Sequence, residues 1–240
     1  MSNRQYEGSE LELFKHAVHW KRYLFKTLSP WLQAERMLEV GSGIGGNVEY
    51  YAAWAKDIVL LEPDSELLQQ SQRACDSLPH ELTFINGTTR SLQRDAIGGG
   101  FDVILYADVL EHIEDSPGEI QQAASMLKSG GRLVIVVPAY PRLFSEFDAE
   151  IGHFRRYTKS MLLEEFQEGF PEGIVKELRH IEAAGVFASF LNKMMLKQSK
   201  PTKSQVAVWD NYMVPVSRYG LDPLFRGRLG KSLIGVIQKP

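Results

Sequence analysis

Residues 39–46 read EVGSGIGG, and glycines at this spacing are typical of turns that hold nucleotide-like cofactors. Glycine lets the backbone turn sharply at the end of a strand and approach a ligand closely. The string fits the dinucleotide pattern G-x-G-x-x-G and equally an acidic-x-G-x-G-x-G pattern that points to S-adenosylmethionine (SAM). The residues that carry these patterns are Glu39, Gly41, Gly43, Gly45 and Gly46. The turn therefore predicts a cofactor site and leaves the cofactor open.

Three features of the surrounding sequence favour SAM over a nicotinamide dinucleotide. Glu39 lies inside the predicted strand, where a dinucleotide site usually has an apolar residue and where a carboxylate can support a loop that receives an ammonium group. The turn also follows a complete predicted helix, and the chain lacks the Tyr-x-x-x-Lys pair of many short dehydrogenases. In both cofactor classes an acidic residue that ends the second strand binds a ribose, and here that residue is Glu62.

The bulk composition is that of an ordinary globular protein and excludes several classes of function. The chain has 240 residues, of which 44% are hydrophobic and 24% charged. A net charge of -3 gives no electrostatic footprint for nucleic acid. We find no apolar run near the ~20 residues needed to span a bilayer and no signal-peptide pattern. Because Cys75 is the single cysteine, we expect no internal disulfide and a cytoplasmic location.

Short apolar segments alternate with longer amphipathic ones, which is the pattern of a parallel sheet with helices on both faces. The predicted strands are 36–40, 57–62, 82–86, 101–107, 131–138, about 174–183 and 231–238. A helix over about 10–28 precedes the first strand. Ser116 and Glu119 predict a capping box at the start of the helix before the fifth strand, and Gly130 predicts its end.

The simplest domain organisation is a single domain over 1–240. Residues 1–35 would form an N-terminal helical cover, and residues 186–229, which carry no strand pattern, a helical insertion before the last strand. KQSKPTKSQ (197–205) reads as an exposed linker within that insertion.

On these motifs the chain resembles the class I SAM-dependent methyltransferases. LEVGSGIGG (38–46) and LLEPD (60–64) are similar to the first two motifs of that family. FDVILYADVLEHIED (101–115) and LKSGGRLVIVVP (127–138) are similar to its fourth and fifth strand segments. The motifs keep the family's order over about residues 36–138. The resemblance implies a Rossmann-like, mostly parallel sheet of seven strands, with the last strand antiparallel.

A weaker likeness extends further along the chain. GHFRRYTKSML (152–162) and GKSLIGVIQKP (230–240) are similar to a bacterial type 11/12-like subgroup with a GHxRRYT loop. That subgroup is often associated with surface-glycan or other specialised metabolism.

The family resemblance also implies which residues contact SAM. Glu62 would bind both ribose hydroxyls, because a carboxylate has two acceptor oxygens. Thr88 stands where many relatives have an aspartate that binds the adenine amino group. The full implied set is Glu39, Gly41, Ser42, Gly43, Gly45, Glu62, Pro63, Thr88, Asp108, Leu110 and His112. Glu39 could instead be a structural cap acceptor, and at least one of Asp108, Glu111 and His112 could be purely structural.

The loop after the fifth strand is the predicted acceptor site. His153 is the candidate base or orienting group, since the unperturbed pKa of histidine suits proton removal near neutral pH. Either Arg155 or Arg156 could hold an acidic acceptor through two parallel hydrogen bonds, with Tyr140 beside them. The alternative is that both arginines pair with local acids on the surface.

We expect transfer of a methyl group to an oxygen of a small or glycan-like metabolite. His153 has no partner at useful ligand spacing in the sequence, so we expect no metal. N-methylation of a small heterocycle or amine is the alternative, followed by a non-catalytic SAM-binding module and an NAD-dependent dehydrogenase. The expected partner is the small-molecule acceptor, with no nucleic acid and no membrane span. A homodimer is compatible with the sequence.

Overall fold

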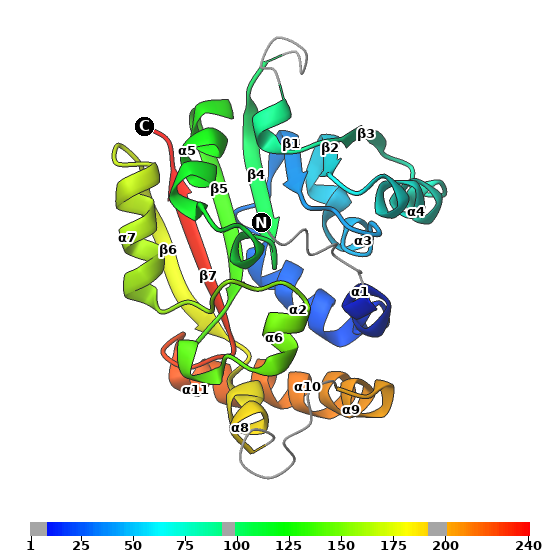
Figure 1. Cartoon of the computed structure of the whole chain (residues 1–240), viewed down its shortest axis with the longest axis vertical. Helices are drawn as coiled ribbons and strands as arrows, with labels where there is room; N and C mark the ends of the chain where they lie inside the picture. Colours follow the sequence, from blue (N-terminus) through cyan, green and yellow to red (C-terminus); the bar gives the residue numbers. More distant parts are fainter. Residues whose placement is uncertain (1–8, 93–98, 192–200) are drawn as a thin grey trace.

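The computed structural model describes residues 9–92, 99–191 and 201–240 (Figure 1). These residues contain a seven-stranded sheet in the order β3-β2-β1-β4-β5-β7-β6. Six strands are parallel to one another, and β7 runs antiparallel to both of its neighbours. The strands are β1 (Ala34–Val40), β2 (Ala55–Glu62), β3 (Glu81–Asn86), β4 (Phe101–Ala107), β5 (Leu127–Pro138), β6 (Ile174–Ile181) and β7 (Ser232–Gln238). The predicted fold class is confirmed.

Helices cover both faces of this sheet. The α-helices are α1 (Ser9–Phe14), α2 (Val18–Leu28), α3 (Val48–Tyr51), α4 (Ser65–Cys75), α5 (Ser116–Met126), α6 (Glu146–Glu150), α7 (Lys159–Gly169), α8 (Ala183–Leu191), α9 (Lys203–Val208), α10 (Val214–Val216) and α11 (Asp222–Phe225). One core cluster packs α5 and α7 against one face, and a second packs α2 and α3 against the other. The central strands contain apolar runs where both of their faces are buried, as in IVLL of β2 and VILY of β4.

The helix before β5 differs from its prediction at both ends. Asp115 caps α5 by accepting a hydrogen bond from the Gly118 amide at 3.1 Å. Glu119 turns into the core instead, where it accepts hydrogen bonds from the hydroxyls of Tyr106 and Thr89. β5 follows α5 directly at Leu127, so the strand begins before the predicted glycine stop. The local pattern failed here because Glu119 has buried hydroxyl partners that a capping box would have left unsatisfied.

The predicted helix over 10–28 is interrupted between α1 and α2. The amides at the start of α2, on His19 and Trp20, donate to the carboxylate of Asp210 at 3.1 and 2.7 Å. Asp210 belongs to η6 (Trp209–Met213), a helical turn between β6 and β7. A residue far away in the sequence therefore caps α2, and it ties the N-terminal helices to the segment that precedes the last strand.

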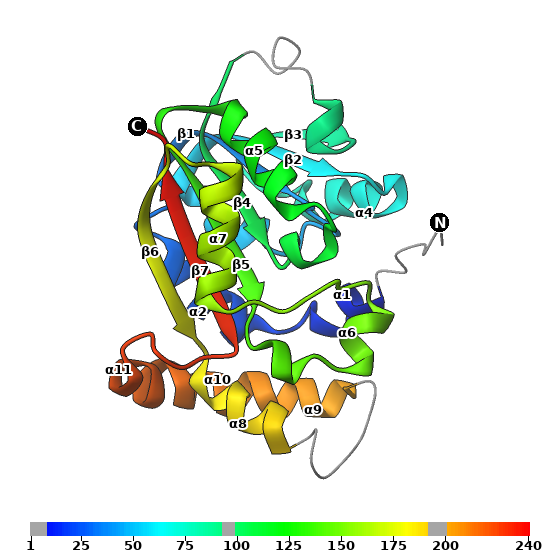
Figure 2. The same ribbon diagram turned by 60° about the vertical axis from the view of Figure 1, so that its left-hand side comes forward.

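That segment begins earlier than predicted, at α8, whose first amides on Glu182 and Ala183 are bonded to Asp222 at 2.6 and 2.8 Å. The predicted linker over 197–205 runs into α9 at Lys203, and its first residues lie outside the described part of the chain. Figures 1 and 2 both place α8, α9 and α10 beyond the carboxyl ends of the parallel strands. Among the described helices, none is long and apolar enough to cross a membrane.

Candidate active site

The glycine turn after β1 adopts a backbone that only glycine tolerates well. Gly41, Gly43 and Gly45 all have positive φ, at 68°, 53° and 74°. A Cβ atom on Gly41 would lie 2.7 Å from Cγ2 of Val109, which follows β4. The Gly41 amide donates to the Leu61 carbonyl in β2 at 2.8 Å. The turn is thus held against both neighbouring strands, at the carboxyl edge where a cofactor binds in sheets of this kind.

Glu62 ends β2 and is joined to the turn by its carboxylate. Its Oε2 accepts from the Gly43 amide at 2.8 Å, and its Oε1 accepts from the Asp64 amide at 3.0 Å. Burial raises the pKa of the Glu62 carboxyl, and these two amide bonds oppose the rise. Each carboxylate oxygen has a second lone pair, so Glu62 can still accept from two adjacent hydroxyls. This geometry suits a ribose.

The adenine side of the predicted site is open. Pro63 is exposed at the end of β2, and its carbonyl accepts from the Asn86 side chain at 3.0 Å. Thr88 is also exposed and precedes the turn η2 (Thr89–Ser91), where its amide donates to the Ser91 hydroxyl. Thr88 therefore occupies the edge at which the sequence places it, with a hydroxyl in place of the aspartate of many relatives.

Glu39 lies behind the glycine turn, almost fully buried. Its carboxylate accepts from Tyr51 at 2.5 Å and from Asn47 at 3.3 Å, so it fixes the helix that follows the turn. Burial raises the pKa of Glu39 to about 7. Nearby, the hydroxyl of Ser42 is buried without a hydrogen-bond partner among the described residues. The turn therefore offers glycine-lined space, an unsatisfied hydroxyl and the Glu62 carboxylate, and this set fits the expected SAM.

The end of β4 carries the next predicted group. Asp108 has a positive φ of 57°, and its amide donates to the Val136 carbonyl at 3.0 Å. Its side chain reaches solvent, yet desolvation by the surrounding protein raises the pKa of its carboxyl, while His153, Lys231 and Arg156 oppose the rise. Leu110 is fully buried in the core, so its side chain packs the sheet and does not line an open site.

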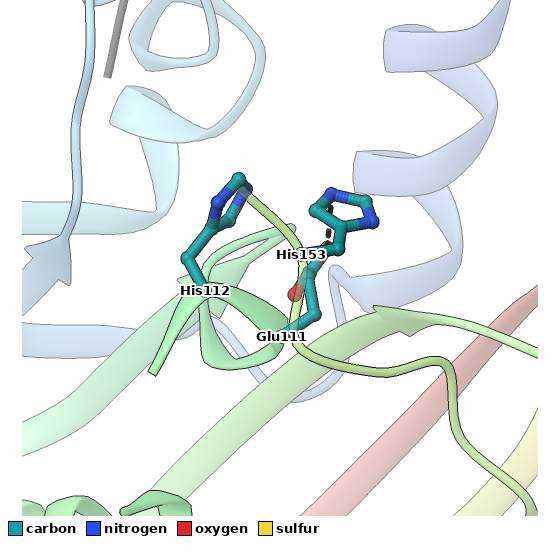
Figure 3. Close-up of side chains that lie close together, drawn as sticks. All are labelled: Glu111, His112 and His153. Atoms are coloured by element: carbon teal, nitrogen blue, oxygen red, sulfur yellow. Dashed lines mark ion pairs between the residues drawn. The ribbon is translucent and has the colours of Figure 1, made fainter. Parts of the chain in front are cut away.

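The loop after β5 brings His153 to this same edge. Nδ1 of His153 lies 2.9 Å from Oδ1 of Asp148, and its ring lies edge-on to His112 with the centroids 4.6 Å apart. Glu111 lies between β4 and α5 in η3 (Leu110–His112), and its Oε1 is 3.8 Å from Nε2 of His153. Figure 3 shows these three side chains converging. The fold brings Glu111 and His112 next to His153, a proximity that the spacing of these residues in the sequence does not indicate.

The two loop arginines point to different places, and neither pairs on the surface with a loop acid. Arg156 is buried and donates to both oxygens of Asp148, at 2.8 and 3.0 Å. These bonds, with those from His153 and Ser145, hold the pKa of Asp148 well below its usual range despite burial.

Arg155 instead joins α5 to the loop, through the Ser116 hydroxyl at 2.5 Å and the Glu114 carbonyl. Neither guanidinium is placed as a free two-pronged clamp for an acceptor.

Tyr140 is another residue with positive φ, at 64°, directly after β5. Its ring stacks on His180 with the centroids 5.1 Å apart, and it lines a surface pocket with Pro141, Arg142 and Thr158. The structure thus places Tyr140 at the predicted strand edge, with its ring on the β6 side.

Lys231, which precedes β7, was missed by sequence reasoning. Its amide donates to the Glu182 carbonyl, and its ammonium lies 5.5 Å from the ring centroid of Trp209. Burial lowers the pKa of Lys231, while Glu182 and Asp108 oppose this shift. The expected topology could have pointed to Lys231, because the start of an antiparallel last strand lies at the carboxyl ends of the parallel strands. Lys231 is therefore a cation at the candidate acceptor side.

Comparison with known proteins finds methyltransferases. The family described as "Methyltransferase domain" matches residues 14–171. Over 142 residues the chain is 30% identical to the demethylmenaquinone methyltransferase of Tropheryma whipplei. The aligned segment covers 58% of this chain and 56% of that protein. Over 102 residues it is 28% identical to the ubiquinone biosynthesis O-methyltransferase of Pectobacterium atrosepticum, covering 42% of each. The chain thus spans only about half the length of these curated relatives.

The fold is also similar to that of the N-methyltransferase NodS from Bradyrhizobium japonicum, solved in complex with S-adenosyl-L-homocysteine. The TM-score is 0.59, the sequence identity is 16%, and the match covers 100% of both chains. At this identity the likeness shows the fold alone.

Proposed function

We propose that this chain, which belongs to the methyltransferase domain family, uses SAM to methylate a hydroxyl oxygen of a small molecule. The observation that carries this proposal is the grouping of His153, Asp108 and Lys231 at one edge of the sheet, next to the glycine turn. A hydroxyl acceptor must lose its proton near the transition state. A site without a group that can take up this proton would instead favour acceptors that need no deprotonation.

The cofactor side of the proposed site is formed by β1 and β2. The glycine turn would receive the methionine part of SAM, and Glu62 would accept from the ribose hydroxyls. When bound, SAM supplies an electrophilic methyl group on a sulfonium centre. The chain's part is to hold the acceptor oxygen in line with that methyl group, because correct placement alone lowers the barrier substantially.

The acceptor side would be formed by the loops after β4 and β5. Asp148 orients His153, so that Nε2 is left as the proton acceptor for an approaching hydroxyl. Lys231 would stabilise the oxyanion that forms, since a cation in a site that excludes water acts strongly on a developing charge. Asp108, with its raised pKa, would bind either the acceptor hydroxyl or the ammonium group of SAM.

The names of the curated relatives support a small cyclic acceptor, and one of the two names supports transfer to oxygen. Both curated relatives are named for steps in quinone biosynthesis, and one is named an O-methyltransferase. The N-methylation alternative is supported by NodS, named an N-methyltransferase, and only through the fold. We therefore propose a hydroxylated ring as the first acceptor to test, and a glycan-like acceptor after it.

We also propose that residues 1–35 and 186–229 act together as a cover within a single domain; of these, 1–8 and 192–200 lie outside the described residues, and the supporting contacts come from the rest. The Asp210 cap on α2 supports this, as does the Leu11 side chain, which would lie 3.1 Å from a Cβ atom on Gly43. α1 thus lies against the turn that would bind the cofactor. A cover in this place would exclude water and commit the bound acceptor.

The experiment is to incubate the full chain with SAM and a panel of phenols, hydroxyquinols, glycans and amines. Production of S-adenosylhomocysteine together with a methylated product would identify the acceptor, and product fragmentation would separate O- from N-methylation. His153→Ala should lower kcat and leave SAM affinity unchanged, the behaviour of a group needed mainly in the transition state. The exposed His16→Ala is the matched control. Full turnover in His153→Ala would refute the assigned acceptor site.

A further inference from the structure

We propose that Glu111, His112 and His153 bind a divalent first-row transition-metal ion, of the Zn²⁺ or Mn²⁺ type, on the acceptor side of the active site. One potential ligand atom from each residue lies within 4.8 Å of the others (Figure 3). Glu111 and His112 are adjacent in η3, and His153 comes from the loop after α6. Two separate connections after β4 and β5 therefore converge on one point.

The carboxylate of Glu111 is the first evidence for a cation. Its side chain is fully buried, and neither of its oxygens has a hydrogen-bond partner among the described residues. Its charged surroundings are the acids Asp108 and Asp148 and the guanidinium of Arg156, with the His153 ring 3.8 Å away. An acidic group buried without a partner is costly, and such groups are normally paired with a cation or coordinate a metal.

The orientation of His153 is the second, independent observation. Asp148 is an anionic acceptor held by Arg156, so the hydrogen bond at 2.9 Å places the His153 proton on Nδ1. Nε2, the other ring nitrogen, faces Oε1 of Glu111 at 3.8 Å. At 3.8 Å the two atoms are too far apart for a direct hydrogen bond, and a cation placed between them could bind both. A carboxylate that orients the far nitrogen of a histidine is the usual outer shell of a metal ligand.

His112 completes the set of ligands. Its ring meets that of His153 edge-on, which keeps the two imidazoles from stacking flat against each other. Two imidazoles and one carboxylate suit Zn²⁺, Mn²⁺, Fe²⁺ or Co²⁺ better than Mg²⁺ or Ca²⁺, which prefer oxygen ligands. Three protein ligands leave at least one coordination position of the ion open. This is typical of catalytic metal sites, whereas structural zinc sites have four protein ligands.

A cation here would change the chemistry of the acceptor side. It would lower the pKa of an acceptor hydroxyl placed beside it. His153 would be the direct base only in the metal-free protein, and in the metal-bound protein it would act on the hydroxyl as a ligand of the ion. This role rests on the proposed O-methylation. Binding of the ion itself does not, because it depends only on residues present before SAM or an acceptor arrives.

The test uses the full chain without an affinity tag, treated with chelator and dialysed. Titration with Zn²⁺ in a calorimeter, in the absence of SAM and acceptor, should show one ion bound per chain. Co²⁺ should give visible absorption bands from the coordinated ion. Glu111→Gln and His112→Ala should each weaken binding by at least about 10-fold, the loss seen even for outer-shell substitutions. The exposed His16→Ala should bind as the wild type does.

Glu111→Gln decides between the metal and the alternative that Glu111 is simply a protonated acid. Glutamine has nearly the same shape, so the variant should fold, and its thermal unfolding checks this. Wild-type protein that binds no ion, or a folded Glu111→Gln that binds Zn²⁺ as tightly as the wild type, would overturn the proposal. Methyl transfer by chelator-treated protein would leave the proposed function intact and remove only the role of the metal.

Discussion

The amide of Gly43 donates a 2.8 Å hydrogen bond to Oε2 of Glu62, so the glycine turn after β1 and the acid at the end of β2 form one unit. Glu62 therefore shapes the turn, and in the proposed cofactor site the remaining lone pairs of its carboxylate would accept from a ribose. This coupling means that substitutions of Glu62 should act on cofactor binding through both the turn and the direct contact.

Replacement of Glu62 by Ala should weaken binding of both SAM and S-adenosylhomocysteine by at least tenfold. Each hydrogen bond to a charged group contributes about 1.5–3 kcal/mol, and about 1.4 kcal/mol corresponds to a factor of ten. Calorimetric titration measures the loss, with the exposed Glu66→Ala in α4 as control. Unchanged affinity in Glu62→Ala would mean that the ribose lies elsewhere.

Gly41→Ala should abolish cofactor binding and destabilise the fold, because the added Cβ would lie 2.7 Å from Val109 and the residue has positive φ. Gly130→Ala is the matched control, since Gly130 also has positive φ but its Cβ would meet no atom within 4 Å. The control should lose only the conformational strain, about 1–2 kcal/mol. Denaturant unfolding of both variants would measure the difference, and equal losses would exclude the clash with Val109.

Arg156→Ala should destabilise the protein by about 3–5 kcal/mol, the loss typical when one partner of a buried ion pair is removed. Asp148 would keep its buried charge without its two guanidinium bonds.

Arg155→Ala should leave the acceptor KM unchanged, because Arg155 binds Ser116 and the Glu114 carbonyl. Urea unfolding and acceptor kinetics measure these effects. A raised acceptor KM in Arg155→Ala would show instead that Arg155 contributes to acceptor binding.

Lys231→Met should raise the acceptor KM or lower kcat, since Lys231 interacts electrostatically with Glu182, Asp148 and Asp108. Lys231→Arg keeps the charge and should retain more activity than the methionine variant. Steady-state kinetics with the identified acceptor would measure the contrast. Equal activity in both variants would assign Lys231 a purely structural part.

The stability contributed by Glu39 should fall as the pH rises. Its folded pKa of about 7 lies above the ordinary value of 4.5, so the folded state binds the proton more tightly. The contribution is fully present below about pH 4.5 and is lost as the pH rises through about 7. Urea unfolding at pH 5 and pH 8 should show a wild-type decrease that is larger than that of Glu39→Gln by about 1–3 kcal/mol. The same decrease in both proteins would exclude Glu39 as the source.

The sequence by itself determined the sheet, the glycine turn and the acid at the end of β2. Each of these is encoded locally: apolar runs of strand length in β4 and β7, glycines at positions with positive φ, and Glu62 at the end of an apolar segment. Local patterns of this kind follow from backbone sterics and from burial on both faces of a strand. They are readable without knowing what packs against them.

Only the tertiary structure decided which polar side chains meet at the carboxyl edge. Glu111 and His153 lie far apart in the sequence, and their approach depends on the adjacency of β4 and β5. The same holds for Asp210, which caps α2 from the other end of the chain. A hydrogen bond or ion pair between distant segments leaves no periodicity in either of them. The sequence could name His153 as a candidate, but its partners follow from the fold, because only the fold sets the distances on which their interaction depends.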